Sequence, residues 1–173
     1  MSSDDATQIE GSFGTGKTTS FDTGYWHPVT LKRVILLFWA AWLTIVTLTN
    51  FFDGLKALGV LGSGWTFASG NYGFMVDVTS VHGTPEIVVS LLFLGVIVWE
   101  AIGAALLWQA FAAFEGVESG LERVYQAFVV SLALFGTFML MTEIFLAFDV
   151  ESTHMRIFIA QLVSLYVIHR LPE

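Results

Sequence analysis

Glu100 is the residue of this 173-residue sequence whose chemistry is most unusual for its surroundings, because it interrupts an apolar stretch at residues 87–114. A charged side chain near the middle of a bilayer costs roughly 2.5–3.5 kcal/mol or more, so such an acid must be neutral, paired or hydrated. Gly103 and Ala104 share its helical face, and their small side chains allow a neighbouring helix to approach closely. We therefore expect Glu100 to be uncharged and to point into a helix bundle. There it would either accept protons or orient a ligand, or make one interhelical hydrogen bond.

A second set of polar residues is expected at one end of the helices. Glu143 shares a helical face with Gly136 and Ala147, so we predict that it points inward, about 10 Å above Glu100. The same level is predicted to hold the end of the first apolar stretch, the start of the last, and part of a long loop. The pattern favours an interfacial hydrogen-bond network that sets helix register, with a functional site as the alternative. This predicted outer polar layer comprises Asn50, Asp53, Asp77, His82, Glu143, His154 and Arg156.

Histidine is the residue type that raises the question of a haem group, because imidazoles can ligate haem iron. Ligation by two histidines needs opposed imidazoles inside a bundle, whereas the histidines of this sequence fall at predicted helix ends or in loops. The sequence contains no cysteine, which excludes disulfides and thiolate metal ligands. We predict no metal and no cofactor, with haem b or a quinone as the alternative. The histidines are His27, His82, His154 and His169.

Residues 11–18 match the phosphate-binding pattern G-x-x-x-x-G-K-[ST], from Gly11 to Thr18 with Lys17 in the penultimate position. Such a loop binds phosphate where a buried strand precedes it and a helix follows it. Residues 1–10 do not read as a strand and residues 18–26 show no amphipathic helical pattern, so we expect no nucleotide binding. The net charge of −8 also argues against nucleic acid as a partner, since that binding requires a basic surface.

The elements that must position Glu100 and the outer polar layer are predicted to be membrane-spanning helices. Hydrophobic residues make up 55% of the sequence and charged residues 13%, whereas about 25% of the residues of a soluble domain are charged. Crossing a bilayer takes about 20 apolar residues. Four stretches are assigned as spans, at residues 31–52, 87–114, 124–148 and 153–171, the last being the least apolar.

The predicted fold class is all-α, an integral membrane up-down-up-down four-helix bundle. The second and third connections are short, which makes successive helices antiparallel. The first connection, residues 54–86, is long and rich in apolar side chains, so we expect it to be partly ordered and to cap one end of the bundle. Residues 31–171 then form a single domain, preceded by a polar, acidic tail at residues 1–30.

Basic residues near the helix ends predict the orientation in the membrane. With the N-terminus in the cytoplasm, most of them lie inside and only Lys56 and Arg156 lie outside. Both termini are therefore expected on the cytoplasmic side of a prokaryotic cytoplasmic membrane. The residues on the inside would be Lys17, Lys32, Arg33, Arg123 and Arg170.

Short motifs in the apolar stretches and the long loop are similar to those of a known family. The motifs are Asn50-Phe51-Phe52-Asp53, Asn71-Tyr72-Gly73-Phe74-Met75, Trp99-Glu100 with Gly103-Ala104, and Glu143 before Phe145. Across about residues 33–170 the sequence resembles the prokaryotic "predicted small integral membrane protein" family, which has four helices and no assigned function. The resemblance implies the four-helix architecture. It also implies that Asn50, Asp53, Glu100 and Glu143 are important residues. It implies no reaction.

The sequence favours a non-catalytic accessory or structural subunit of a larger membrane complex, of the respiratory or another electron-transfer type. The small size, the apolar loop suited to docking and the helix faces rich in small residues are the reasons. The expected partners are the lipid bilayer and other membrane-protein subunits, and the chain is not expected to be an enzyme by itself. The alternative is a small proton-coupled transporter or channel that uses Glu100. A third hypothesis is a subunit that binds a quinone or haem.

Overall fold

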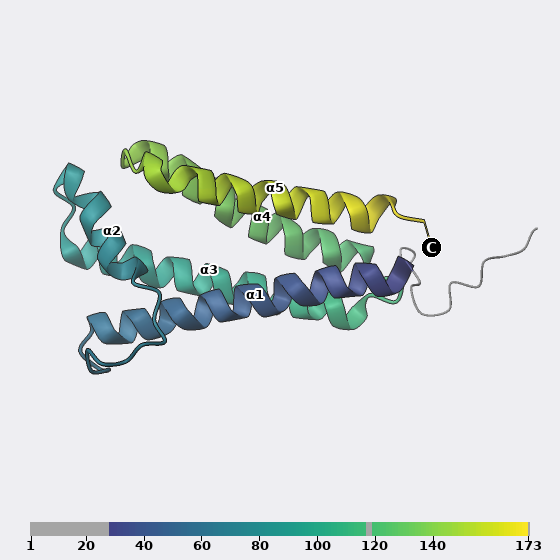
Figure 1. Ribbon diagram of the computed structural model, residues 1–173, viewed down its shortest axis with the longest axis horizontal. Helices are drawn as coiled ribbons and strands as arrows, with labels where there is room; N and C mark the ends of the chain where they lie inside the picture. The colour runs from purple at the N-terminus through teal and green to yellow at the C-terminus, as the bar shows by residue number, and fades with distance from the viewer. Residues whose placement is uncertain (1–27, 117–118, 173) are drawn as a thin grey trace, which may run out of the picture.

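The computed structural model describes residues 28–116 and 119–172 (Figure 1). A short helix, α2 (Asn71–Thr79), continues into the single 3-10 turn η1 (Ser80–His82), and both lie between the first two of the long helices. Within the described ranges no β-strand is found, and the all-α prediction is confirmed for them. The long helices are α1 (Pro28–Ala57), α3 (Glu86–Ala113), α4 (Leu121–Ile144) and α5 (Phe148–Arg170).

Helix α1 is longer than predicted at both ends. It begins at Pro28, three residues early, and proline suits a first turn because the N–H that it lacks would have no partner in the helix. It continues to Ala57, five residues past the predicted end, and Gly59 follows with a φ of 72°. Glycine adopts this left-handed conformation readily and commonly ends a helix. Residues 1–27 of the predicted tail, with the pattern at 11–18 and His27, lie outside the described residues.

Three of the helices, α1, α3 and α4, are long and apolar enough to cross a membrane. The chain is therefore a membrane-embedded protein. The predicted four-span bundle is supported for these three spans only, because α5 does not reach the same hydropathy.

Two polar residues in the middle of α5, Gln161 and Ser164, are directed toward other helices. The side-chain amide of Gln161 donates a hydrogen bond to Ser131 Oγ on α4 at 2.7 Å, and both residues are buried. The indole N–H of Trp39 on α1 donates to Ser164 Oγ at 2.9 Å. Interhelical hydrogen bonds of this kind stabilise helix association in membranes. The low hydropathy of α5 thus reflects, in part, contacts inside the bundle.

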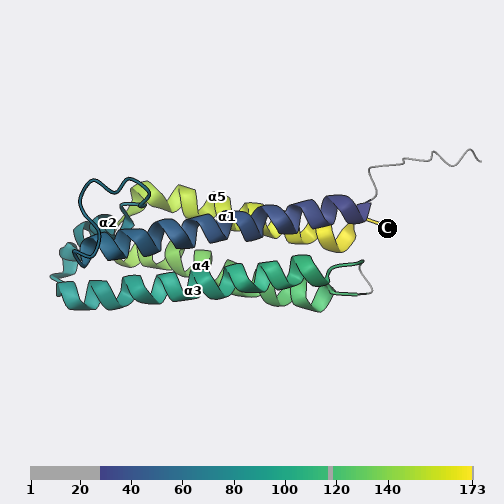
Figure 2. The same cartoon turned by 90° about the horizontal axis from the view of Figure 1, so that it is seen from below.

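The long helices alternate in direction, so that the first residues of α1 and the last residues of α5 lie at the same end of the molecule (Figures 1 and 2). Helix α1 packs against α3, α3 against α4 and α4 against α5, while α1 and α5 touch only slightly. Figure 1 shows the α1–α3 pair and the α4–α5 pair diverging toward the end that carries α2. The bundle is therefore closed at one end and splayed at the other.

The apolar core lies at the closed end. Its members come from the first half of α1, the second half of α3, the start of α4 and the end of α5. The α1–α3 contact is close there, because a Cβ on Gly103 would lie 3.0 Å from Leu43 Cδ2. The fully buried members include Leu36, Leu43, Leu107, Phe114, Val124, Phe128 and Ile168. At the splayed end, the buried polar side chains of Asn50 and Asp53 lie on the same helix pair as the buried apolar Val89 and Phe93.

Candidate functional site

The side chain of Glu100 on α3 is hydrogen-bonded to Asn50 on α1. The Asn50 side-chain amide donates to both carboxyl oxygens, at 2.8 Å to Oε1 and 2.9 Å to Oε2. Both residues are only 2% exposed, so this polar pair is shielded from solvent within two membrane-spanning helices. The inward orientation expected for Glu100 is observed, and its partner is an amide rather than a basic residue.

A third residue extends this pair toward the surface. Asn71, the first residue of α2, donates its side-chain N–H to Asn50 Oδ1 at 2.8 Å. Asn50 therefore uses its amide nitrogen for Glu100 and its oxygen for Asn71. Because Asn71 is exposed, a continuous hydrogen-bonded path runs from the buried carboxyl of Glu100 to the outside of the α1–α3 pair.

Asp53, one turn after Asn50, holds the start of α2. Its Oδ2 accepts the backbone N–H of Tyr72 at 2.7 Å and the hydroxyl of Ser69 at 3.3 Å. The Ser69 oxygen in turn accepts the backbone N–H of Asn71 at 3.1 Å. An acid at a helix N-terminus satisfies an N–H group that has no partner in the helix and interacts favourably with the helix dipole. The end of α1 thus fixes where α2 begins.

The side chain of Tyr72 joins α2 to the first turns of α3. Its hydroxyl lies 2.9 Å from Ser90 Oγ and donates to Glu86 Oε1 at 3.3 Å. Its ring packs edge-on against Phe93, with 5.5 Å between ring centroids. We call the linked side chains the polar cluster: Asn50, Asp53, Ser69, Asn71, Tyr72 and Glu100.

The predicted outer polar layer is divided between the two helix pairs. Asn50 and Asp53 belong to the polar cluster on α1–α3, whereas Glu143, His154 and Arg156 lie on α4 and α5. The prediction that Asn50 lies at the end of its helix, at the level of Glu143, is wrong because α1 continues to Ala57. Asn50 therefore lies seven residues, or about 10 Å, before the end of its helix and reaches Glu100.

The inward orientation predicted for Glu143 is wrong. Glu143 is exposed, and its neighbour Thr142 is buried and donates to the Met139 carbonyl at 2.7 Å. The prediction assumed a helix that continues to residue 148, but α4 ends at Ile144 and the chain turns through Leu146 with a φ of 55°. Glu143 therefore lies in the last turn, where its carboxylate reaches solvent.

His154 and Arg156 also occupy different environments. Arg156 is exposed. The ring of His154 is half-buried and packs against Phe138 of α4, with 5.1 Å between ring centroids. Its Nδ1 is buried and has no hydrogen-bond partner among the described residues. His154 thus contributes to the packing of α5 against α4.

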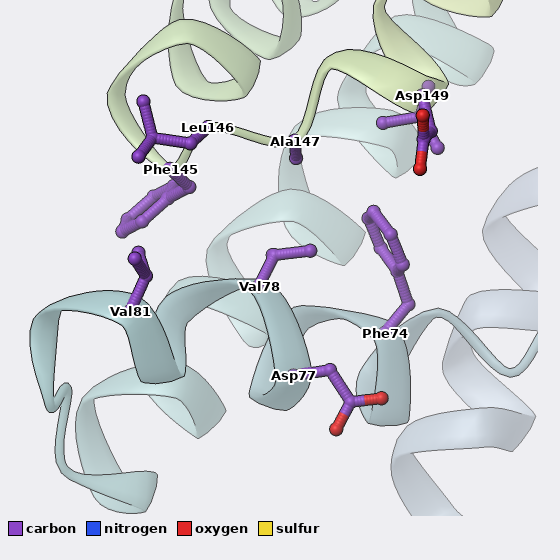
Figure 3. Close-up of a pocket in the computed structure, with 9 residues that line it drawn as sticks. Phe74, Asp77, Val78, Val81, Phe145, Leu146, Ala147 and Asp149 are labelled. Atoms are coloured by element: carbon purple, nitrogen blue, oxygen red, sulfur yellow. The ribbon is translucent and has the colours of Figure 1, made fainter.

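The two loop members of the predicted layer approach the turn between α4 and α5. His82 Nε2 donates to the carbonyl oxygen of Ile144 at 2.8 Å, and its ring packs against Phe145. Beside this contact is a cavity of about 310 Å³ between α2–η1 and the α4–α5 turn (Figure 3). Its lining is mainly apolar, and the Asp77 carboxylate points away from the facing Phe145 and Leu146.

No group of three or more histidine or acidic side chains in residues 28–116 and 119–172 is placed to hold a metal ion. The expectation that the chain carries no cofactor stays a prediction. Comparison with protein-family models, with curated proteins and with solved structures gives no match. The family resemblance described above therefore also stays a hypothesis.

Sequence reasoning placed Asn50, Asp53 and Glu100 among the site residues but missed Ser69, Asn71 and Tyr72. The missed residues lie in the connection between α1 and α3, whose path could not be derived from hydrophobic patterning. One signal was present, because the motifs at residues 50–53, 71–75 and 99–100 that carry the resemblance meet in the polar cluster. Shared motifs that are distant in sequence could have suggested that these segments touch.

Replacing Asp53 with alanine should loosen α2 while leaving the long helices in place. The substitution removes the acceptor of the Tyr72 N–H, and losing a capping side chain costs about 1 kcal/mol. Hydrogen exchange of the Tyr72 amide should then be about fivefold faster. Asp77→Ala is the matched control, since Asp77 is exposed on the same helix and should have no effect. Equal exchange rates in the two variants would contradict the capping role.

Proposed function

We propose that this chain is a non-catalytic accessory subunit of a larger membrane complex, of the respiratory or another electron-transfer type. The observation that carries the proposal is the attachment of α2 to α1 and α3 through the polar cluster. Asn50 and Asp53 contact α2 through Asn71 and the Tyr72 N–H, at 2.8 and 2.7 Å. A helix held this way presents a defined surface at one end of the bundle.

The position of α2 supports contact with another subunit. Its nine residues are not needed to connect two spans, and α2 makes most of its contacts with the outer ends of α1 and α3. Phe74 and Val81 line the cavity that faces the α4–α5 turn and remain 39% and 53% exposed. Exposed apolar side chains held in a fixed arrangement are typical of protein contact surfaces.

The experiment that tests the proposal is purification of the chain at its natural level from the membranes of the cell that makes it. A mild detergent keeps membrane assemblies intact, and native mass measurement then gives the composition. We expect the chain in a particle with other membrane subunits, in fixed proportion. A monomer or a particle built only from this chain would overturn the proposal.

A small proton-coupled transporter or channel is the second candidate, favoured by the burial of Glu100. The hydrogen-bonded path through Asn50 to the exposed Asn71 gives the carboxyl a polar connection to one side. Reconstituted vesicles with a pH-sensitive dye would test this function. Proton uptake that requires the chain and is lost in Glu100→Gln would favour it over the accessory role.

We also propose that α5 crosses the membrane with α1, α3 and α4, and that both termini lie in the cytoplasm of a prokaryotic cell. The packing of α5 along α4 and the pairing of Gln161 and Ser164 with other helices support the fourth span. The distribution of basic residues supports the orientation.

Single cysteines at Ser12, Ser63 and Ser119 should report this topology, because the sequence has no cysteine of its own. Ser63 lies in the connection between α1 and α2, and Ser119 lies between α3 and α4 at the opposite end. An impermeant thiol reagent added outside intact cells should label only the Ser63→Cys variant. Labelling of the Ser12 or Ser119 variant instead would show that the orientation is the opposite of the one proposed.

A further inference from the structure

The connection at residues 58–70 folds back along α1 instead of leaving the bundle. The backbone N–H of Ser69 donates to the carbonyl oxygen of Thr49 at 3.2 Å. Thr49 lies eight residues before the end of α1 at Ala57, which corresponds to about 12 Å along the helix axis. The 58–70 loop therefore returns from the end of α1 to the level of the polar cluster.

Aromatic contacts hold the returning part of this loop against α1. The rings of Trp65 and Phe67 lie 5.3 and 5.8 Å from the ring of Phe52. Lys56 Nζ donates to the carbonyl oxygen of Trp65 at 3.0 Å, and the Trp65 indole N–H donates to the carbonyl oxygen of Phe67 at 3.0 Å. These contacts fix the loop without burying it, since Trp65 and Phe67 remain 42% and 45% exposed.

The loop has the composition of a segment in contact with lipid. Residues 57–70 include no charged side chain, and Leu58 and Val60 are 73% and 66% exposed. Figures 1 and 2 show the loop on the side of α1 that faces away from α3. The exposed side chains of Leu48 and Phe51 continue this apolar surface down the membrane-spanning part of α1.

We propose that the 58–70 loop is a lipid-binding element, with Trp65 and Phe67 at the boundary between headgroups and acyl chains of the nearer leaflet. Tryptophan suits this boundary because its ring is apolar and its N–H is polar. Lipid is the expected contact of this loop because its apolar surface is continuous with the exposed face of α1. This inference goes beyond the proposed accessory role. It assigns this loop to lipid, whereas the proposed contact with a partner subunit is made by the α2–η1 segment.

A spin label at a single cysteine tests the proposal in the intact chain. Thr66→Cys places the label between the two aromatic residues, at an exposed side chain that makes no hydrogen bond to another described residue. The protein is placed in nanodiscs of phosphatidylethanolamine and phosphatidylglycerol, in which solution reaches both faces. Collision of the label with oxygen, which concentrates in lipid, is compared with collision with a water-soluble nickel complex. Ser119→Cys, in the exposed connection between α3 and α4, is the matched control.

The label at residue 66 should collide several-fold more with oxygen than with nickel, and the label at residue 119 should show the reverse. Preference for nickel at residue 66 would place the loop in water and overturn the proposal. Weak collision with both reagents would mean that protein covers the loop, which also overturns it. Replacing Trp65 and Phe67 with serine should shift the residue 66 label toward nickel. An unchanged ratio of oxygen collision to nickel collision at residue 66 would show that these rings do not hold the loop in lipid.

Discussion

Replacing Glu100 with alanine should lower the free energy of unfolding by about 2–4 kcal/mol, whereas replacing it with glutamine should have a much smaller effect. Alanine leaves the Asn50 side-chain amide buried without an acceptor, which costs about 1–3 kcal/mol, and it also opens a cavity. Glutamine retains the side-chain volume and one oxygen that can accept from Asn50. The difference in unfolding free energy between the two variants therefore measures the hydrogen bond and the packing together. Neither contribution requires Glu100 to be charged.

Equilibrium unfolding in mixed micelles would measure both variants of Glu100. Glu143→Ala is the matched control, because Glu143 is an exposed acid on a neighbouring helix and its loss should change stability little. A glutamine variant as unstable as the alanine variant would show that the negative charge is required. That result would contradict our expectation that Glu100 is uncharged.

Replacing Asn50 with leucine should cost about 1–3 kcal/mol and should also loosen the start of α2. Leucine has the same number and branching of side-chain heavy atoms as asparagine, so the shape that packs between α1 and α3 is largely kept. The buried carboxyl of Glu100 then loses the amide that donates to both of its oxygens, and an unpaired buried polar group is penalised by this amount. Asn71 loses its acceptor at the same time. The same unfolding measurement gives the change in stability. Faster hydrogen exchange of the α2 amides would show that α2 is loosened.

Thr47→Val is the matched control for Asn50→Leu. Thr47 is one turn earlier on α1, and its hydroxyl donates to the Leu43 carbonyl of its own helix at 2.8 Å. Replacing it removes a polar group without leaving a partner on another helix unpaired, so stability and exchange should change little. Equal effects of the two variants would contradict a specific role for Asn50.

The position of Glu100 could be predicted from its sequence neighbours. Gly103 and Ala104 lie on the same helical face, and both are buried where α1 approaches α3. Helical periodicity fixes which side chains share a face, so the small residues identified the buried side. The long helices were likewise predictable, because apolar stretches of this length have few alternatives to a membrane span.

The partner of Glu100 could not be predicted in the same way. Pairing Asn50 with Glu100 requires the relative depth of two helices, and the predicted end of α1 was five residues too early. The contribution of Asn71 depends on the path of the 58–70 loop, which is determined by tertiary contacts such as the Ser69–Thr49 hydrogen bond. Neither feature has a periodic signal in the sequence.

The error on α4 and the low hydropathy of α5 have different causes. Glu143 was assigned to a helix that continues past residue 144, and the left-handed conformation of Leu146 is one that leucine rarely adopts, so the turn had no sequence signal. The hydropathy of α5 is lowered by Gln161 and Ser164, which contact other helices, and by exposed charged residues such as Arg156. Hydropathy counts a polar side chain equally whether it faces lipid or another helix.

The most direct test of the account is the size of the native assembly that contains the Asn50→Leu variant, compared with that of Thr47→Val. Both chains are expressed at the natural level, extracted in mild detergent and examined by native mass measurement. If the polar cluster holds α2 in position for a partner subunit, the Thr47→Val chain should remain in the large particle and the Asn50→Leu chain should leave it while still inserting in the membrane. Retention of the Asn50→Leu chain in the particle, with α2 shown by hydrogen exchange to be loosened, would contradict the account.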